Sequence, residues 1–183
     1  MKYLLFSGSL RSESLNKKLI TVVHKTLGQH TENEITLADI RTLAIPIYDG
    51  DIETIGIPEG VQQLGELINI ANAVIISSPE YNSSIAGPLK NTIDWLSRLK
   101  PVPLESKPIF LLGASSGGFG AIRGLTVTRA PLEALGSYVF PQTFGLPKAH
   151  EAFNSDGVLV DANTQKKLSD ALFKFSQFAA KFK

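Results

Sequence analysis

Short apolar runs alternate with segments of helical periodicity along most of this chain, and this alternation limits the fold more than any other feature. Residues 3–6, 73–76 and 109–112 are nearly all apolar, as is typical of strands buried on both faces of a sheet. Residues 34–38 alternate partly, and a short fifth strand is expected near residues 137–140. Strands that alternate with helices in this way predict an α/β fold, an open five-stranded parallel sheet with helices on both faces.

Apolar residues at helical spacing predict the helices that connect these strands. Ser14 is expected to cap the first of them, and Pro131 is expected to kink or break the fourth. Residues 39–60 carry prolines and turn residues and are expected to form a long loop. The helices are expected at residues 15–27, 61–68, 89–96, from a glycine-rich loop to about residue 135, and over residues 168–182. With no linker or repeat in view, residues 1–183 are expected to form a single domain.

Composition excludes several classes of function. The formal net charge is +1, so no overall field favours nucleic acid or an anionic membrane. The absence of cysteine excludes disulfides, thiolate nucleophiles and cysteine-ligated metal centres, and no metal site is expected. The apolar run at the N-terminus is too short for a signal peptide, and no stretch approaches the length of a membrane span, so we expect a cytoplasmic protein.

Three polar loops, at residues 8–16, 78–84 and 113–120, each follow one of the apolar runs. Ligands of open parallel sheets bind beyond the carboxyl ends of the strands, where the strand order reverses, so the three loops are expected to converge there. The first offers hydroxyl, guanidinium and amide groups beside the N-terminus of a helix, which suits a phosphate monoester. The alternative is an ordinary capped helix start with Arg11 in solvent. The chain carries neither G-x-x-x-x-G-K-[ST] nor G-x-G-x-x-G, which argues against the better-known phosphate loops.

The second and third loops are suited to a planar ring. Pro79 to Asn82 present backbone donors and acceptors, and Tyr81 offers an aromatic wall, although a packing role for Tyr81 is the alternative. The small residues of the third loop let backbone amides approach a ring closely. The Glu80 side chain is expected to point away from the ring, because a carboxylate beside a reduced, anionic flavin would be unfavourable. The three loops together indicate a bound flavin nucleotide.

These residues resemble the NADPH-dependent FMN reductase family of flavodoxin-like proteins. Gly8, Ser9, Arg11, Ser14 and Asn16 match the family's G-S-x-R-x-x-S-x-N motif. The second motif, P-E-Y-N-x-S-x-P-G-x-L-K-N-x-I-D-W, is matched from Pro79 to Trp95, except that Ala86 stands where the family has proline. The third, G-x-S-x-G-x-x-G-x-x-R, is matched by Gly113, Ser115, Gly117, Gly120 and Arg123. The resemblance implies a flavodoxin-like sheet of order 2-1-3-4-5.

The resemblance also implies a site and an activity. Ser9, Arg11, Ser14 and Asn16 would hold the FMN phosphate; Pro79, Glu80, Tyr81 and Asn82 would line the isoalloxazine; and Ser115, Gly117 and Gly118 would close its other side. NADPH or NADH would pass hydride through bound FMN to a small acceptor such as a quinone, flavin, azo compound or chromate, with no catalytic acid or base. Arg123 could meet the phosphate of a nicotinamide cofactor, but a surface or interface salt bridge, and first of all an interface one, is expected. Family members are commonly homodimers or homotetramers, and the helix that carries Asp94 and Trp95 is the expected boundary.

Two alternatives stay open at this point. A flavodoxin-type electron carrier would use the same fold without turnover of NAD(P)H, but the +1 charge and Arg11 argue against it. A flavin-free binding domain that has kept the fold is the other alternative, and it predicts that the purified protein is colourless and binds no FMN.

Overall fold

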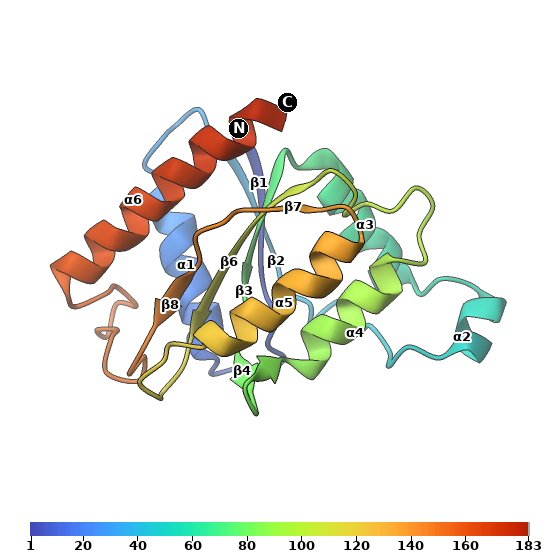
Figure 1. The fold of residues 1–183 in the computed structure, drawn as a ribbon, viewed down its shortest axis with the longest axis horizontal. Coiled ribbons are helices and arrows are strands. Elements are labelled where there is room, and N and C mark those ends of the chain that lie inside the picture. Colours follow the sequence, from blue (N-terminus) through green and yellow to red (C-terminus); the bar gives the residue numbers. More distant parts are fainter. Residues whose placement is uncertain (183) are drawn as a thin grey trace.

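A parallel sheet forms the centre of the molecule in the computed structural model, which describes residues 1–182 (Figure 1). Its strands lie in the order β2-β1-β3-β6-β7, and β8 also pairs with β6. Each pair of neighbouring strands in this sheet is parallel. The strands are β1 (Lys2–Ser7), β2 (Glu34–Ala38), β3 (Ala73–Ser77), β6 (Pro108–Ala114), β7 (Tyr138–Val139) and β8 (Phe144–Leu146). The predicted order is confirmed, with β6 as the fourth strand and β7 and β8 as two pieces of the fifth.

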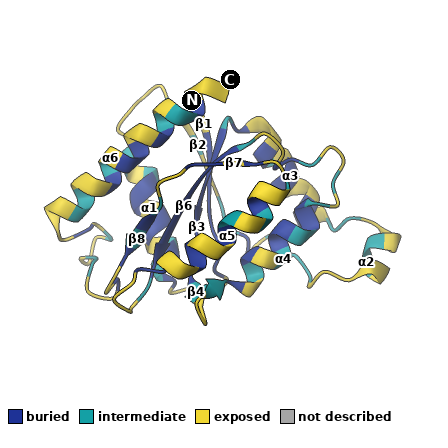
Figure 2. Cartoon of the chain, viewed as in Figure 1, coloured by how far each residue is buried: buried dark blue, intermediate teal, exposed yellow. Residues whose placement is uncertain are grey.

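Helices cover both faces of this sheet, and Figure 2 shows the central strands β1, β3 and β6 buried between them, whereas the edge strand β2 has no buried residue. On one face, α1 (Leu15–Leu27) and α6 (Ala162–Ala179) pack over alternate strand residues such as Leu5 and Phe110. The other face is covered by α3 (Glu59–Ile70), α4 (Gly87–Leu96) and α5 (Ile122–Ala134), which pack over residues such as Leu4 and Ile76. Because successive strand residues point to opposite faces, the nearly continuous apolar runs supply both cores.

Short elements inside the predicted loops are the main difference from the sequence-based expectation. Asn82 and Ser83 both have positive φ, 51° and 61°, and turn the chain between β4 (Glu80–Tyr81) and β5 (Ser84–Ile85), an antiparallel hairpin. The long loop contains α2 (Gly50–Ile55), and the 3₁₀ helix η1 (Ala180–Phe182) follows α6. Elements of this length carry too few residues for a periodic pattern to reveal them.

Pro131 does not break α5, which continues as a helix to Ala134. The expected break is therefore wrong. Pro131 lies in the last turn, where its missing N–H removes a single helical hydrogen bond close to an end that frays in any case.

Candidate cofactor site

The three polar loops meet in one cleft of about 410 Å³ at the carboxyl edge of the sheet. This convergence was predicted, and the lining of the cleft confirms it. The lining residues are Ser9, Arg11, Glu13, Ser14, Leu15, Asn16, Pro79, Glu80, Tyr81, Ala114, Ser115 and Ser116. Eight of the eleven predicted contacts are among them, and Asn82, Gly117 and Gly118 are not.

The first loop has the donors that a phosphate requires. Ser14 caps α1, as predicted, because its Oγ accepts hydrogen bonds from the backbone N–H groups of Asn16 and Lys17. The Oγ of Ser9 accepts a bond of 3.3 Å from the backbone N–H of Arg11. Each hydroxyl keeps its own proton to donate. The Arg11 side chain is exposed and makes no ion pair within residues 1–182, so its guanidinium is free to meet an anion. This donor set, beside the positive end of α1, fits the phosphate of FMN.

Asn16 lines the same cleft but directs its side-chain amide into the protein. The residue is 3% exposed, and its amide bonds Ser77 and Ala114 at the ends of β3 and β6. Its contacts thus differ from those of a phosphate ligand that faces the cleft.

The second loop presents one wall of the cleft through Pro79 and Tyr81. Tyr81 is 49% exposed, which leaves much of its ring available to a ligand. Asn82 occupies the turn of the β4–β5 hairpin and is exposed there. The Glu80 carboxylate accepts hydrogen bonds from Arg123 Nε at 3.1 Å and from the backbone N–H of Gly124 at 3.0 Å. The carboxylate is thus held against α5, in line with the expectation that it faces away from the ring.

The third loop contributes Ser115, together with Ala114 and Ser116, which the sequence reasoning left out. Gly117 donates its N–H to Ser115 Oγ and accepts a backbone bond from Lys148, so its peptide groups already have partners. Gly118 has open space around it. Leu15 and Glu13 are further lining residues that sequence reasoning missed, and their position next to Ser14 was the signal available.

A sequence model of the family described as NADPH-dependent FMN reductase matches residues 1–151. The chain belongs to this family. The enzyme class predicted from the motifs, an NAD(P)H-dependent FMN oxidoreductase, is therefore confirmed.

Relatives extend the similarity over nearly the whole chain. An NAD(P)H-dependent FMN reductase of Pseudomonas aeruginosa is 37% identical over 175 residues, covering 94% of this chain and 91% of that protein. A quinone reductase of Escherichia coli is 34% identical over 180 residues, covering 96% and 94%. The solved structure of the flavoenzyme NAD(P)H:acceptor oxidoreductase FerB of Paracoccus denitrificans has a TM-score of 0.84 at 29% identity, covering 99% and 98%. The similarity to the FerB structure confirms the flavodoxin-like fold.

In this member of the FMN reductase family, an ion pair joins one wall of the cleft to helix α5. Arg123 Nη2 lies 3.0 Å from Glu80 Oε1, which links the β4–β5 hairpin to α5. The Arg123 guanidinium also lies 4.9 Å from the ring centre of Phe119 in the third loop, within cation–π range. A Cβ on Gly124 would come within 2.9 Å of Ser84 O, so hairpin and helix are in direct backbone contact. The predicted salt bridge of Arg123 is therefore found within one chain.

Replacing Arg123 by alanine should lower the free energy of unfolding by about 1 kcal/mol, because the Glu80 side chain, 9% exposed, would lose its charged partner. The loss is small because the Arg123 side chain is 55% exposed and screened by water. Urea unfolding measures it. Lys18→Ala, at an exposed position of α1, is the control and should change the stability by less than about 0.5 kcal/mol. An equal loss of unfolding free energy in both variants would contradict the role of Arg123 in linking the β4–β5 hairpin to α5.

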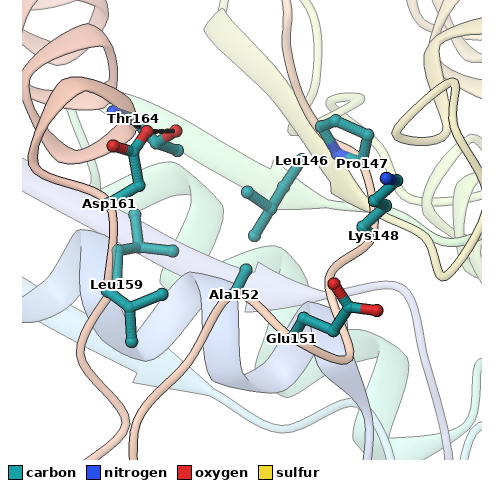
Figure 3. A pocket seen from close by; sticks show the side chains of 9 residues that line it. Leu146, Pro147, Lys148, Glu151, Ala152, Leu159, Asp161 and Thr164 are labelled. Carbon is teal, nitrogen blue, oxygen red and sulfur yellow. Dashed lines mark hydrogen bonds between the residues drawn. The ribbon is translucent and has the colours of Figure 1, made fainter.

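A second cavity, of about 230 Å³, lies between the end of β8 and the start of α6 (Figure 3). Asp161 caps α6 and accepts a bond of 2.6 Å from Thr164 Oγ1. The hydrogen bonds from Thr164 hold the pKa of Asp161 below its ordinary value. None of the predicted site residues lines this cavity. Its wall nevertheless supports the third loop, because Lys148 donates its backbone N–H to Gly117 O.

Metal sites and membrane spans are two further features that the described part of the chain does not contain. Within residues 1–182, no three metal-binding side chains come together. No helix in that range combines the length and the apolar character that a membrane crossing requires.

Proposed function

We propose that this protein binds FMN in the three-loop cleft and uses it to reduce a small acceptor with electrons from NADPH or NADH. The observation that carries the proposal is the free Arg11 guanidinium beside the capped N-terminus of α1, in the same cleft as Tyr81 and Ser115. Ser9, Arg11 and Ser14 would hold the phosphate. The backbone of Pro79, Glu80 and Tyr81 would line the ring on one side, and Ser115 would close the other side.

When bound, FMN supplies a ring that accepts hydride from a nicotinamide and passes electrons on to an acceptor. The chain's own residues then have to bind, orient and shield this ring. Tyr81 provides an aromatic wall, and the small side chains of Ala114, Ser115 and Ser116 leave room in the cleft for a ligand. The Glu80 carboxylate is engaged by Arg123 and Gly124, which keeps its negative charge off the ring. Asn82, Gly117 and Gly118 lie outside the lining, and the proposal does not depend on them.

The test is NAD(P)H oxidation by purified protein, measured against a panel of acceptors with and without added FMN. We expect a yellow protein, or one that takes up FMN, that is bleached rapidly by NADPH or NADH and then reoxidised by the acceptor. Bound FMN that stays oxidised after mixing would indicate an electron carrier instead. Failure to bind FMN at all would indicate a flavin-free domain.

Quinones and free flavins are the acceptors that we propose to test first. The names of the relatives support this choice, because one is a quinone reductase and another an FMN reductase. Azo compounds and chromate complete the panel, and parallel assays with NADPH and NADH measure the coenzyme preference. The cytoplasmic location expected from the sequence stays a prediction.

We also propose that the protein is a homodimer or homotetramer. Trp95, expected near a subunit boundary, is fully buried and donates its indole N–H to Pro46 O. It thereby anchors an arm, residues 46–57, that carries α2 away from the other helices (Figure 1). This arm exposes Ile47 by 85% and Ile55 by 89%, and α2 has no buried residue. Covering these two side chains by a second copy would remove that apolar surface from water.

Ile55→Asp is expected to shift the protein toward monomer, because a carboxylate at a covered apolar contact loses its hydration. Sedimentation velocity over a range of concentrations measures the shift. Thr54→Asp is the matched control, since Thr54 is exposed on the same short helix but is polar. A monomeric wild-type protein, or the same shift in both variants, would contradict the involvement of the arm.

A further inference from the structure

The Asn16 side chain connects the first loop with the ends of β3 and β6, from which the other two loops start. Its Oδ1 accepts hydrogen bonds from Ser77 Oγ at 2.9 Å and from the backbone N–H of Ala114 at 2.8 Å. Its Nδ2 donates to the backbone carbonyl of Ala114 at 2.9 Å. Three of the four hydrogen-bonding capacities of the amide are therefore used inside the protein.

The position of Asn16 follows from a gap in the sheet. In the parallel ladder between β3 and β6, Ser77 faces Leu112, so the next outward residue of β6, Ala114, would be opposite Pro79. In this ladder Ser78 donates its backbone N–H to Leu112 O, so a continued β3 would bond Ala114 through the carbonyl of Ser78 and the N–H of Glu80, but β3 ends at Ser77. The Asn16 amide provides at Ala114 the donor and the acceptor that a continued β3 would have provided. This pairing also fixes the orientation of the amide, since the Ala114 N–H requires an oxygen and its carbonyl requires an N–H.

The Asn16 amide connects three parts of the cofactor cleft that are far apart in sequence. Ser77 lies 61 residues and Ala114 lies 98 residues from Asn16. Asn16 itself lies in the first turn of α1, and its backbone N–H donates to Ser14 Oγ. Ala114 directly precedes Ser115, and Ser77 lies two residues before Pro79. A displacement of the Asn16 amide would therefore shift residues at the start of all three loops.

We propose that Asn16 is a positioning residue that sets the relative placement of the three loops and has no direct part in holding the phosphate. The proposal rests on the function proposed above for the cleft. It separates Asn16 from Ser9, Arg11 and Ser14, with which its motif groups it. Its hydrogen bonds to Ser77 and Ala114 leave a single amide hydrogen without a protein partner.

Two ligands that differ only in the phosphate distinguish the roles. Affinity for FMN and for riboflavin is measured by flavin fluorescence with folded wild-type protein, Asn16→Ala and Ser77→Ala. If Asn16 is a positioning residue, Asn16→Ala should lower the affinity for FMN and for riboflavin by the same factor, about tenfold. The reason is that buried groups at Ala114 and Ser77 lose their partners. Ser77→Ala removes one hydrogen bond to the Asn16 amide and should lower the affinity for both flavins by about threefold. Asn163→Ala, at an exposed position of α6, is the control and should leave both affinities unchanged.

A loss in Asn16→Ala that is confined to FMN would overturn the proposal and make Asn16 a phosphate ligand, and unchanged affinity for both flavins would overturn it as well. A wild-type protein that binds neither flavin would instead refute the function proposed for the cleft. Hydrogen exchange of the protein without flavin then still tests the positioning role of Asn16. Asn16→Ala should speed exchange in residues 7–14 and at 113–117 together, and unchanged protection of the Ala114 amide would overturn the proposal.

Discussion

Replacing Arg11 by alanine is expected to raise the Kd for FMN about thirtyfold, or about 2 kcal/mol, because a charge-assisted contact with the phosphate is lost. The guanidinium is exposed and has no carboxylate partner in residues 1–182, so its removal frees no buried charge and should leave the fold intact. Equilibrium titration of FMN fluorescence measures the change. Repeating it at higher ionic strength should reduce the difference between wild type and variant, as expected for an electrostatic contact at a surface.

Riboflavin provides the internal control for Arg11. It lacks the phosphate, so its affinity should be nearly the same in wild type and in Arg11→Ala. Lys18→Ala removes a positive charge from an exposed position of the same helix and should leave FMN affinity within about twofold of wild type. An unchanged Kd for FMN in Arg11→Ala would show that the first loop does not hold the phosphate.

Gly120→Ala is expected to lower the free energy of unfolding by about 3 kcal/mol, from two causes that add. Gly120 has a φ of +59°, a left-handed conformation that a side chain disfavours. Its Cβ would also come within 2.7 Å of Gly145 C and 2.8 Å of Leu146 N, both backbone atoms of β8. Backbone at such a position can move only if the third loop lifts from the sheet edge. Thermal and urea unfolding measure the loss.

Substitutions at two other glycines distinguish the conformational cost from the steric cost. Gly157 has a φ of +69°, and a Cβ there would meet no atom within 4 Å, so Gly157→Ala should cost about 1 kcal/mol from conformation alone. Gly118 has neither a positive φ nor a close neighbour, so Gly118→Ala should change stability by less than about 0.5 kcal/mol. A loss in Gly120→Ala no larger than that in Gly157→Ala would contradict the close contact with β8.

The centre of the sheet was predicted well because its strands are buried on both faces. A continuous apolar run such as Val74 to Ile76 is typical of a parallel strand buried on both faces. The polar loops that follow such strands were therefore expected to meet at one edge of the sheet. The fifth strand was less well predicted. It pairs with β6 in two pieces, Tyr138–Val139 and Phe144–Leu146, and neither is long enough to show a period.

The site was predicted at the level of loops better than at the level of side chains. Residue type and spacing indicated that Ser9, Arg11 and Asn16 belong to one cleft, and the lining agrees. The role of Asn16 depends on Ala114, 98 residues away, and no local pattern contains that contact. The same holds for Glu80, whose partner Arg123 lies 43 residues further along the chain.

The 98-residue span between Asn16 and Ala114 also determines when during synthesis a binding cleft can exist. A nascent chain still attached to the ribosome has no completed cleft until β6 has left the exit tunnel and paired with β3, because contacts of such long range form late. Phe110 of β6 also lacks Phe175, on which its ring stacks, until α6 has been made. Binding of FMN in this cleft therefore requires that β6 has been made and has paired with β3.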